Sequence, residues 1–196
     1  MHFLTSAIWC SMGHKLHLSA HFCIAAAFAL FVIPLPWCAG AFLAALVHEL
    51  SHIAAIYLLG ERILDIRIGI LGAIIVTQPM KQGREVVCAA FGPLGSLIFA
   101  AAFSFFPEAA LCALVQGLYN LLPVYPLDGG RILHCLLPKA VCIGIEIFTL
   151  IMLLGLGIWL SLTFQLGYLP LIPCFSAAFR VYHRKISCKE SNLAVQ

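Results

Sequence analysis

Charge is the scarcest component of this 196-residue chain. Only 10% of its residues are Asp, Glu, Lys or Arg, while 63% are hydrophobic and the mean hydropathy is +1.05. A soluble domain carries about a quarter charged residues, so the composition excludes an ordinary soluble protein and indicates an integral membrane protein. The net charge of +3 and the pI near 8.4 do not indicate a nucleic-acid partner, because the basic residues are needed at membrane borders.

The chain also lacks any CxxC pair, although it has nine cysteines. Paired-cysteine zinc sites and redox motifs need that short spacing. Most of these cysteines lie in apolar stretches, where Cys behaves as a small hydrophobe. Packing is therefore the favoured interpretation over a disulfide framework or a thiolate metal site. The cysteines stand at positions 10, 23, 38, 88, 112, 135, 142, 174 and 188.

Long apolar runs are abundant instead. Because about 20 apolar residues cross a membrane as a helix, the sequence predicts an all-α polytopic membrane protein with about six transmembrane helices. The predicted spans are 20–36, 38–60, 84–106, 108–130, 140–163 and 166–182. We expect one membrane domain over 1–182 and a short cytoplasmic tail over 183–196.

The fourth span is unusual, because its apolar part stops near Leu122 and is followed by Pro123 and Pro126. Irregular backbone at membrane depth is tolerated only where it is buried in protein or lines a wet cavity. The pattern therefore predicts that Asp128, which follows the second proline, lies inside a site.

The basic residues predict the orientation. If the N-terminus is cytoplasmic, six spans put all eleven Lys and Arg residues in or beside cytoplasmic segments, as the positive-inside rule requires. Both termini are then cytoplasmic. The first 14 residues have neither a basic start nor a convincing cleavage site, so we expect no removable signal peptide.

The segment 62–70 alternates apolar and polar residues, with Leu64, Ile66 and Ile68 on one face. This period of two predicts a half-buried strand. A turn and a second strand over 74–77 would complete a small β-hairpin, and 15–19 is a further candidate strand. An exposed edge of the strand at 62–70 would let an extended substrate pair with it by β-augmentation. A hairpin that only caps the helices is the alternative.

Residues 48–52 read His-Glu-Leu-Ser-His, the HExxH pattern, inside the second predicted span. A charge at mid-bilayer costs about 3 kcal/mol on insertion scales, so such a cluster indicates function. Four helical residues turn through about 400°, which brings His52 back beside His48 one turn along. Both imidazoles can then bind one metal, and Glu49, about 100° round the helix, can reach an attacking water as general base.

A zinc ion with two histidines needs a third protein ligand and an open position. Two acids within the predicted spans are candidates, Asp128 and Glu146. Asp128 is favoured because prolines bend the backbone before it and Gly129-Gly130 allow close approach after it. Glu146 has the alternative of a structural carboxylate paired with a neighbour such as Lys139.

Three motifs taken together, HELSH at 48–52, FGPLGS at 91–96 and NLLPVYPLDGG at 120–130, resemble the site-2 protease family of intramembrane zinc metallopeptidases (peptidase M50). The resemblance covers about residues 15 to 182. It implies one zinc ion (Zn²⁺) per chain, with His48, His52 and Asp128 as ligands and Glu49 as base. Ser96 stands where many relatives have Asn, so only a packing role is carried over to it.

The layout and small size resemble the sporulation subgroup, whose bacterial members process a membrane-tethered pro-sigma factor. This implies a multi-pass protein of the inner membrane, surrounded by the lipid bilayer, with inhibitory membrane partners. The sequence has neither the nucleotide-binding (CBS) domain after residue 182 that many of that subgroup carry nor the PDZ insertion of the envelope-stress subgroup.

Several polar residues near the motifs have competing interpretations. Asn120 would supply a neutral donor to the developing oxyanion or orient the substrate, with a helix–helix hydrogen bond as an equal alternative. We expect Arg131 to anchor its span at the cytoplasmic surface and His134 to be interfacial. His17 and His21 are expected at the entry of the first span, and none of these three histidines is expected to bind the metal.

Other functions remain open. Within the same enzyme class, the chain would be a general protease of membrane remnants or of anti-sigma factors. In another class, it would be a metal transporter or a non-catalytic membrane scaffold. A transporter commonly needs ionisable residues at several depths, whereas here they converge on one site, and a passive metal site has no use for Glu49.

Overall fold

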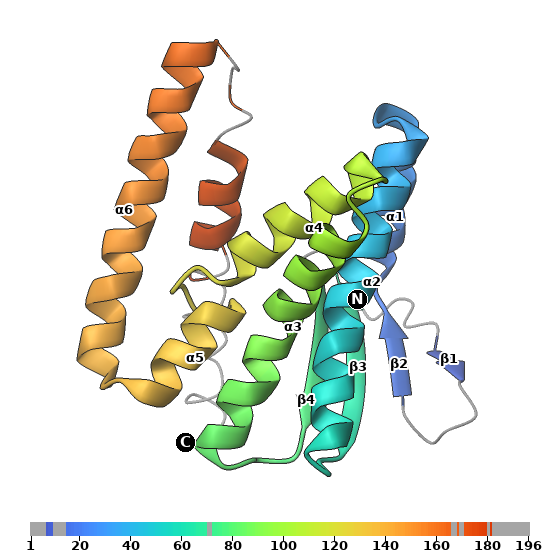
Figure 1. Cartoon of the computed structure of the whole chain (residues 1–196), viewed down its shortest axis with the longest axis vertical. Coiled ribbons are helices and arrows are strands. Elements are labelled where there is room, and N and C mark those ends of the chain that lie inside the picture. The colour runs from blue at the N-terminus through green and yellow to red at the C-terminus, as the bar shows by residue number, and fades with distance from the viewer. Residues whose placement is uncertain are drawn as a thin grey trace, which may run out of the picture. The chain divides into compact units, whose positions relative to one another are not determined.

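The computed structural model describes residues 7–9, 15–69, 72–165, 168, 171–179 and 181, with the backbone alone for the strands before residue 19. The chain is mostly helical (Figure 1). It divides into two compact units, Met1–Gly117 and Leu118–Gln196, which are described in turn. The predicted tail over 183–196 lies outside the described residues.

The first unit contains a four-stranded sheet, in the order β1-β2-β3-β4. The strands are β1 (Ala7–Trp9), β2 (Lys15–Leu18), β3 (Ile63–Gly69) and β4 (Gly72–Thr77). β1 pairs antiparallel with β2, β2 parallel with β3, and β3 antiparallel with β4. The predicted hairpin and the candidate strand at 15–19 are thereby confirmed, although an all-α class with only a hairpin understates the sheet.

Two details of the strand prediction are wrong. β3 has a strand on each side, so its edge is not available to a substrate, and the edge strands of the described sheet are β1 and β4. The register also shifts between Ile63 and Asp65. A bulge of this kind re-aims the side chains around it, so Ile63 is 5% exposed and Leu64, predicted on the inner face, is 50% exposed.

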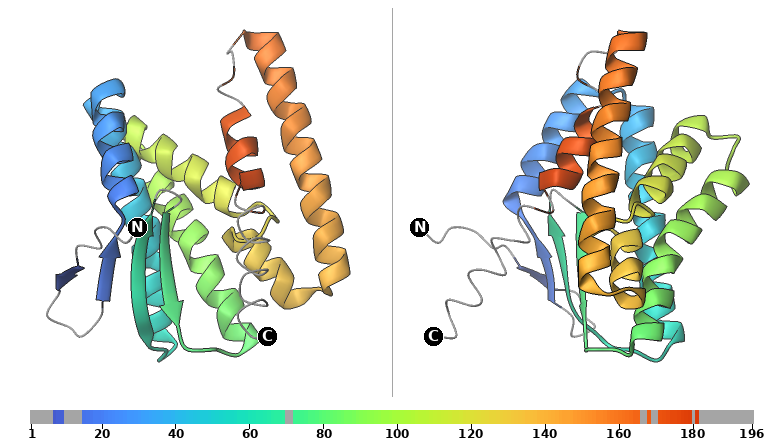
Figure 2. Two further views of the ribbon diagram at one scale, coloured as in Figure 1. Left: turned by 180° about the vertical axis from the view of Figure 1, so that it is seen from behind. Right: turned by 90° about the vertical axis from the view of Figure 1, so that its left-hand side faces the viewer.

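The helices of the first unit are α1 (Ala20–Val32), α2 (Leu35–Leu58), α3 (Gln82–Ala102) and α4 (Pro107–Asn120). The side chain of Ser19 caps α1, because its Oγ accepts from the backbone N–H of Phe22 at 3.2 Å. Helices α2 and α3 pack along each other, and the sheet runs beside them (Figure 2). Ala55, Ile56, Ile63 and Cys88, contributed by α2, β3 and α3, form the core between them.

The second unit consists of the end of α4, a loop over 121–127, α5 (Asp128–Leu136), α6 (Lys139–Phe164) and a helical stretch over 171–179. Val124 and Leu127 of the loop are buried against Ala177, with Leu150 of α6 packed on the same cluster. The loop is therefore part of a packed core, as the paired prolines predict.

Three described helices are long and apolar enough to cross a membrane: α2, α3 and α6. α1 has 13 residues and is shorter than a span needs. The fourth predicted span is interrupted as expected, because α4 ends at Asn120. The six predicted spans are thus not confirmed as six membrane-length helices.

Candidate metal centre

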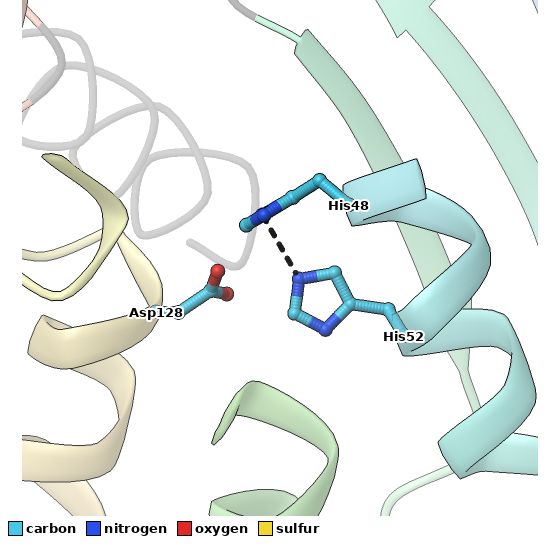
Figure 3. A group of neighbouring side chains, drawn as sticks. All are labelled: His48, His52 and Asp128. Atoms are coloured by element: carbon cyan, nitrogen blue, oxygen red, sulfur yellow. Dashed lines mark hydrogen bonds between the residues drawn. The ribbon is translucent and has the colours of Figure 1, made fainter. Parts of the chain in front are cut away.

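His48 and His52 lie side by side on the buried face of α2. The pattern is helical throughout, as predicted, and the two residues are 3% and 8% exposed. Their ring centroids are 4.9 Å apart with the planes at 86°. Figure 3 shows the two Nε2 atoms directed at each other, and they are 3.3 Å apart.

Each histidine is held from behind by α3. The Nδ1–H of His52 donates to the backbone carbonyl of Cys88 at 2.7 Å, which fixes the tautomer with its lone pair on Nε2. The Nδ1 of His48 is hydrogen-bonded to the Oγ of Ser96 at 3.0 Å, and Ser96 is fully buried. Partners of this kind orient metal-binding imidazoles. Sequence reasoning gave Ser96 only a packing role.

The glycines of α3 make room for these side chains. A Cβ at Gly92 would overlap the imidazole of His52, and a Cβ at Gly95 would overlap the side chain of Ser51. Both helices are regular here, so the close approach depends on the missing side chains. The signal for this contact in the sequence was the small-residue motif at 91–96.

The spacing of the two Nε2 atoms fits a metal. Two nitrogens bound to one tetrahedral zinc, with Zn–N bonds of about 2.0–2.1 Å, lie about 3.3–3.4 Å apart. The distance between the Nε2 atoms of His48 and His52 is 3.3 Å. Glu49, the next residue along α2, is half-buried. The first unit thus carries two preorganised nitrogen donors and an adjacent carboxylate.

In the second unit, Asp128 is the first residue of α5 and is 6% exposed (Figure 3). A carboxylate at a helix N-terminus is stabilised by the unpaired N–H groups of the first turn. The guanidinium of Arg131, which is partly exposed, lies 3.9 Å from the Oδ1 of Asp128. Arg131 therefore faces the acid as well as the surface where it was expected.

Gly129 and Gly130 bring the loop onto the first turn of α5. A Cβ at Gly129 would overlap the backbone carbonyl of Leu121, and one at Gly130 would overlap the backbone of Val124. The predicted close approach is confirmed. The loop also contains a cis peptide bond before Pro126.

Glu146 and His134 differ from expectation. Glu146 is buried on α6, and its Oε1 lies 2.8 Å from the Nε2 of His134 and accepts from the backbone N–H of Tyr125 at 3.2 Å. His134, predicted to be interfacial, is thus paired within the unit, and Lys139 is not the partner that the structure gives Glu146. This pairing joins residues on two different helices, so no local sequence pattern predicted it.

The other predicted polar residues lie at or near the ends of elements. Asn120 is the last residue of α4 and is half-buried. His17 belongs to β2, and His21 is exposed on the first turn of α1.

Two comparisons with known proteins bear on this site. Residues 74–162 match the model of Peptidase family M50, a stretch that contains the FGPLGS and NLLPVYPLDGG motifs and begins after HELSH. The structure of the Site-2 Protease from Methanocaldococcus jannaschii shares the fold, with a TM-score of 0.62 and 21% sequence identity over 89% of this chain and 94% of that chain. No curated protein matches the chain.

Proposed function

We propose that the chain, whose residues 74–162 match the model of Peptidase family M50, is an intramembrane zinc metalloendopeptidase that cuts a membrane-tethered protein. The observation that carries the proposal is the placement of HELSH within α2. This helix has 24 residues and is apolar enough to span a membrane, and its two histidines have the nitrogen spacing of a tetrahedral zinc site. A protease with its site in such a helix would act on peptide bonds at membrane depth.

His48, His52 and Asp128 are the proposed ligands of one zinc ion per chain. All three are buried, two of them on α2 in the first unit and the third at the start of α5 in the second. Two imidazoles and a carboxylate are a donor set that catalytic zinc uses with a fourth position open. When bound, zinc would lower the pKa of a water molecule and polarise the scissile carbonyl.

Glu49 is the proposed general base. Its place next to His48 on the same helix lets it take a proton from the attacking water and pass that proton to the leaving amine. Asn120, at the end of α4, would donate from its side-chain amide to the carbonyl oxygen as negative charge develops. Neither step needs a further ionisable group.

The proposed substrate is a membrane-tethered protein of the bacterial inner membrane, and a sporulation pro-sigma factor is the specific candidate. The support is the likeness of the motifs and the small size to the sporulation subgroup. The distribution of basic residues supports cytoplasmic termini and hence a site that opens toward a cytoplasmic substrate. Inhibitory membrane partners would then control access.

We further propose that β4 pairs with the substrate in place of the strand at 62–70. β4 is an edge strand of the described sheet, and its Ile74 is 63% exposed, so an extended peptide can add there. Ile74→Pro should abolish cleavage while zinc content is retained, whereas Ile74→Thr should cleave normally. Normal cleavage by the proline variant would contradict this role.

Co-expression with a tagged pro-sigma factor tests the main proposal, comparing the wild type with Glu49→Gln at matched zinc content. Cleavage lost only in the variant supports a metalloprotease that uses Glu49 as base. Equal cleavage by both would refute the mechanism. If neither cleaves and both bind zinc, the pro-sigma assignment is wrong, and a general protease of membrane remnants or anti-sigma factors becomes the candidate. Zinc flux into vesicles would favour a transporter.

A further inference from the structure

We propose that Glu146 is a positioning residue that fixes the place of Asp128 by bonding to the chain on both sides of it. The inference concerns the second unit alone and rests on the proposed role of Asp128 as a metal ligand. No motif includes Glu146, and the proposed mechanism does not use it. Its contacts nevertheless converge on the segment that presents Asp128.

One oxygen of Glu146 makes both contacts. The Oε1 accepts from the backbone N–H of Tyr125 at 3.2 Å and lies 2.8 Å from the Nε2 of His134. Tyr125 belongs to the loop three residues before Asp128, and His134 belongs to α5 six residues after it. The rings of Tyr125 and His134 also meet edge to face, with centroids 5.3 Å apart. The carboxylate thus ties the loop and α5 to the same point on α6.

The free-energy cost of burying an acid in α6 argues that Glu146 has a role there. α6 is the most apolar of the three candidate spans, and after Lys139 at its first position Glu146 is its only Asp, Glu, Lys, Arg or His. Ionisable groups inside such helices are costly, and they are paired and functional where they occur. Glu146 is 6% exposed, and its contacts with Tyr125 and His134 help to offset the cost of burial.

The competing explanation is that Glu146 only helps α5 to pack on α6. A neighbouring residue on α6 provides a control that distinguishes this packing role from the positioning of Asp128. Cys142, one turn before Glu146, is fully buried, and its Sγ contacts the carbonyls of Leu133 and Leu137 at 3.6 and 3.5 Å. Those contacts hold α6 to α5 only. Glu146 differs because it also reaches the loop.

The test is the zinc Kd of the full-length purified protein, measured by chelator competition beside the melting temperature. Glu146→Ala should raise the Kd about tenfold, the lower end of the effect of partners that orient metal ligands. Glu146→Gln keeps an acceptor oxygen and should restore an affinity near that of the wild type. Cys142→Ala should leave the Kd unchanged. A wild-type Kd for Glu146→Ala would overturn the inference, as would a Kd raised equally by Cys142→Ala.

Asp128→Ala in the same assay separates this inference from the proposed function. If it leaves the Kd unchanged, Asp128 is not a ligand and the proposed ligand set fails. If it weakens zinc binding and Glu146→Ala does not, only the positioning role fails. Should Glu146→Ala not fold, His134→Ala removes the contact with α5 alone. A raised Kd for that variant at an unchanged melting temperature supports the inference, and an unchanged Kd refutes it.

Discussion

Replacing Gly92 by Ala should weaken zinc binding strongly without unfolding the protein. The added Cβ would overlap the Nε2, Cε1 and Cδ2 atoms of the His52 ring. The ring cannot retreat easily, because its Nδ1 is tied to the Cys88 carbonyl on the same helix as Gly92 at 2.7 Å. The imidazole must therefore rotate away from His48, and the 3.3 Å spacing of the two Nε2 atoms is lost.

The cost in stability is small by comparison. Overpacking of a buried position lowers the free energy of unfolding by about 1–3 kcal/mol. Ala in place of Gly within a helix raises it by about 1 kcal/mol. The net loss is therefore about 0–2 kcal/mol, which a folded protein survives. Zinc binding loses much more, because one of two nitrogen donors is misplaced. We expect the zinc Kd to rise at least about 100-fold, the upper end of the range for disturbed ligand support.

Gly83→Ala is the matched control. Gly83 lies on the same helix, α3, and a Cβ there meets nothing within 4 Å. The control should bind zinc like the wild type. Chelator competition gives the Kd of each variant, and circular dichroism confirms that both are folded. A folded Gly92→Ala variant with wild-type zinc affinity would refute the assignment of His52 as a ligand held in this position.

Three further outcomes are expected. Ser96→Ala, which removes the hydroxyl bonded to the first histidine, should raise the zinc Kd about tenfold. Ser51→Ala, which removes a hydroxyl that donates to the Val47 carbonyl of its own helix at 2.7 Å, should not raise the Kd, and equal effects of the two substitutions would contradict the role of Ser96. Gly130→Ala should abolish cleavage by pushing the loop off α5, whereas Gly144→Ala, in open space, should cleave normally. Arg84→Ala, at a half-exposed ion pair, should lower the free energy of unfolding by less than about 1 kcal/mol, and a larger fall in denaturant titration would show that this ion pair is not a weak surface pair.

The sequence predicted the parts of the site that depend on local geometry. The separation of His48 and His52 on a helix determines which side chains share a face. The two prolines and two glycines around Asp128 likewise predicted a break followed by a tight approach. Such patterns act within one or two turns of chain, so they can be interpreted without knowing the fold.

Long-range pairing could not be predicted in the same way. The parallel pairing of β2 with β3 joins segments separated by two helices, and it places β3 inside the sheet instead of at its edge. The bulge at Ile63 is likewise a property of the pair β3–β4 and not of either strand alone. The contact of Ser96 with His48 depends on how closely α3 approaches α2, which the small residues permit but do not specify.

The positions that supply the hydrogen-bond partners of the two histidines should differ in the substitutions that they tolerate. The acceptor for His52 is a main-chain carbonyl, which no substitution at position 88 can remove as long as the new side chain fits. The partner of His48 is a side-chain hydroxyl, which only a few short polar residues can replace. In a library randomised at both positions and selected for activity, position 88 should therefore retain several small apolar residues. Position 96 should retain almost none but those that offer a hydrogen-bonding atom close to the helix.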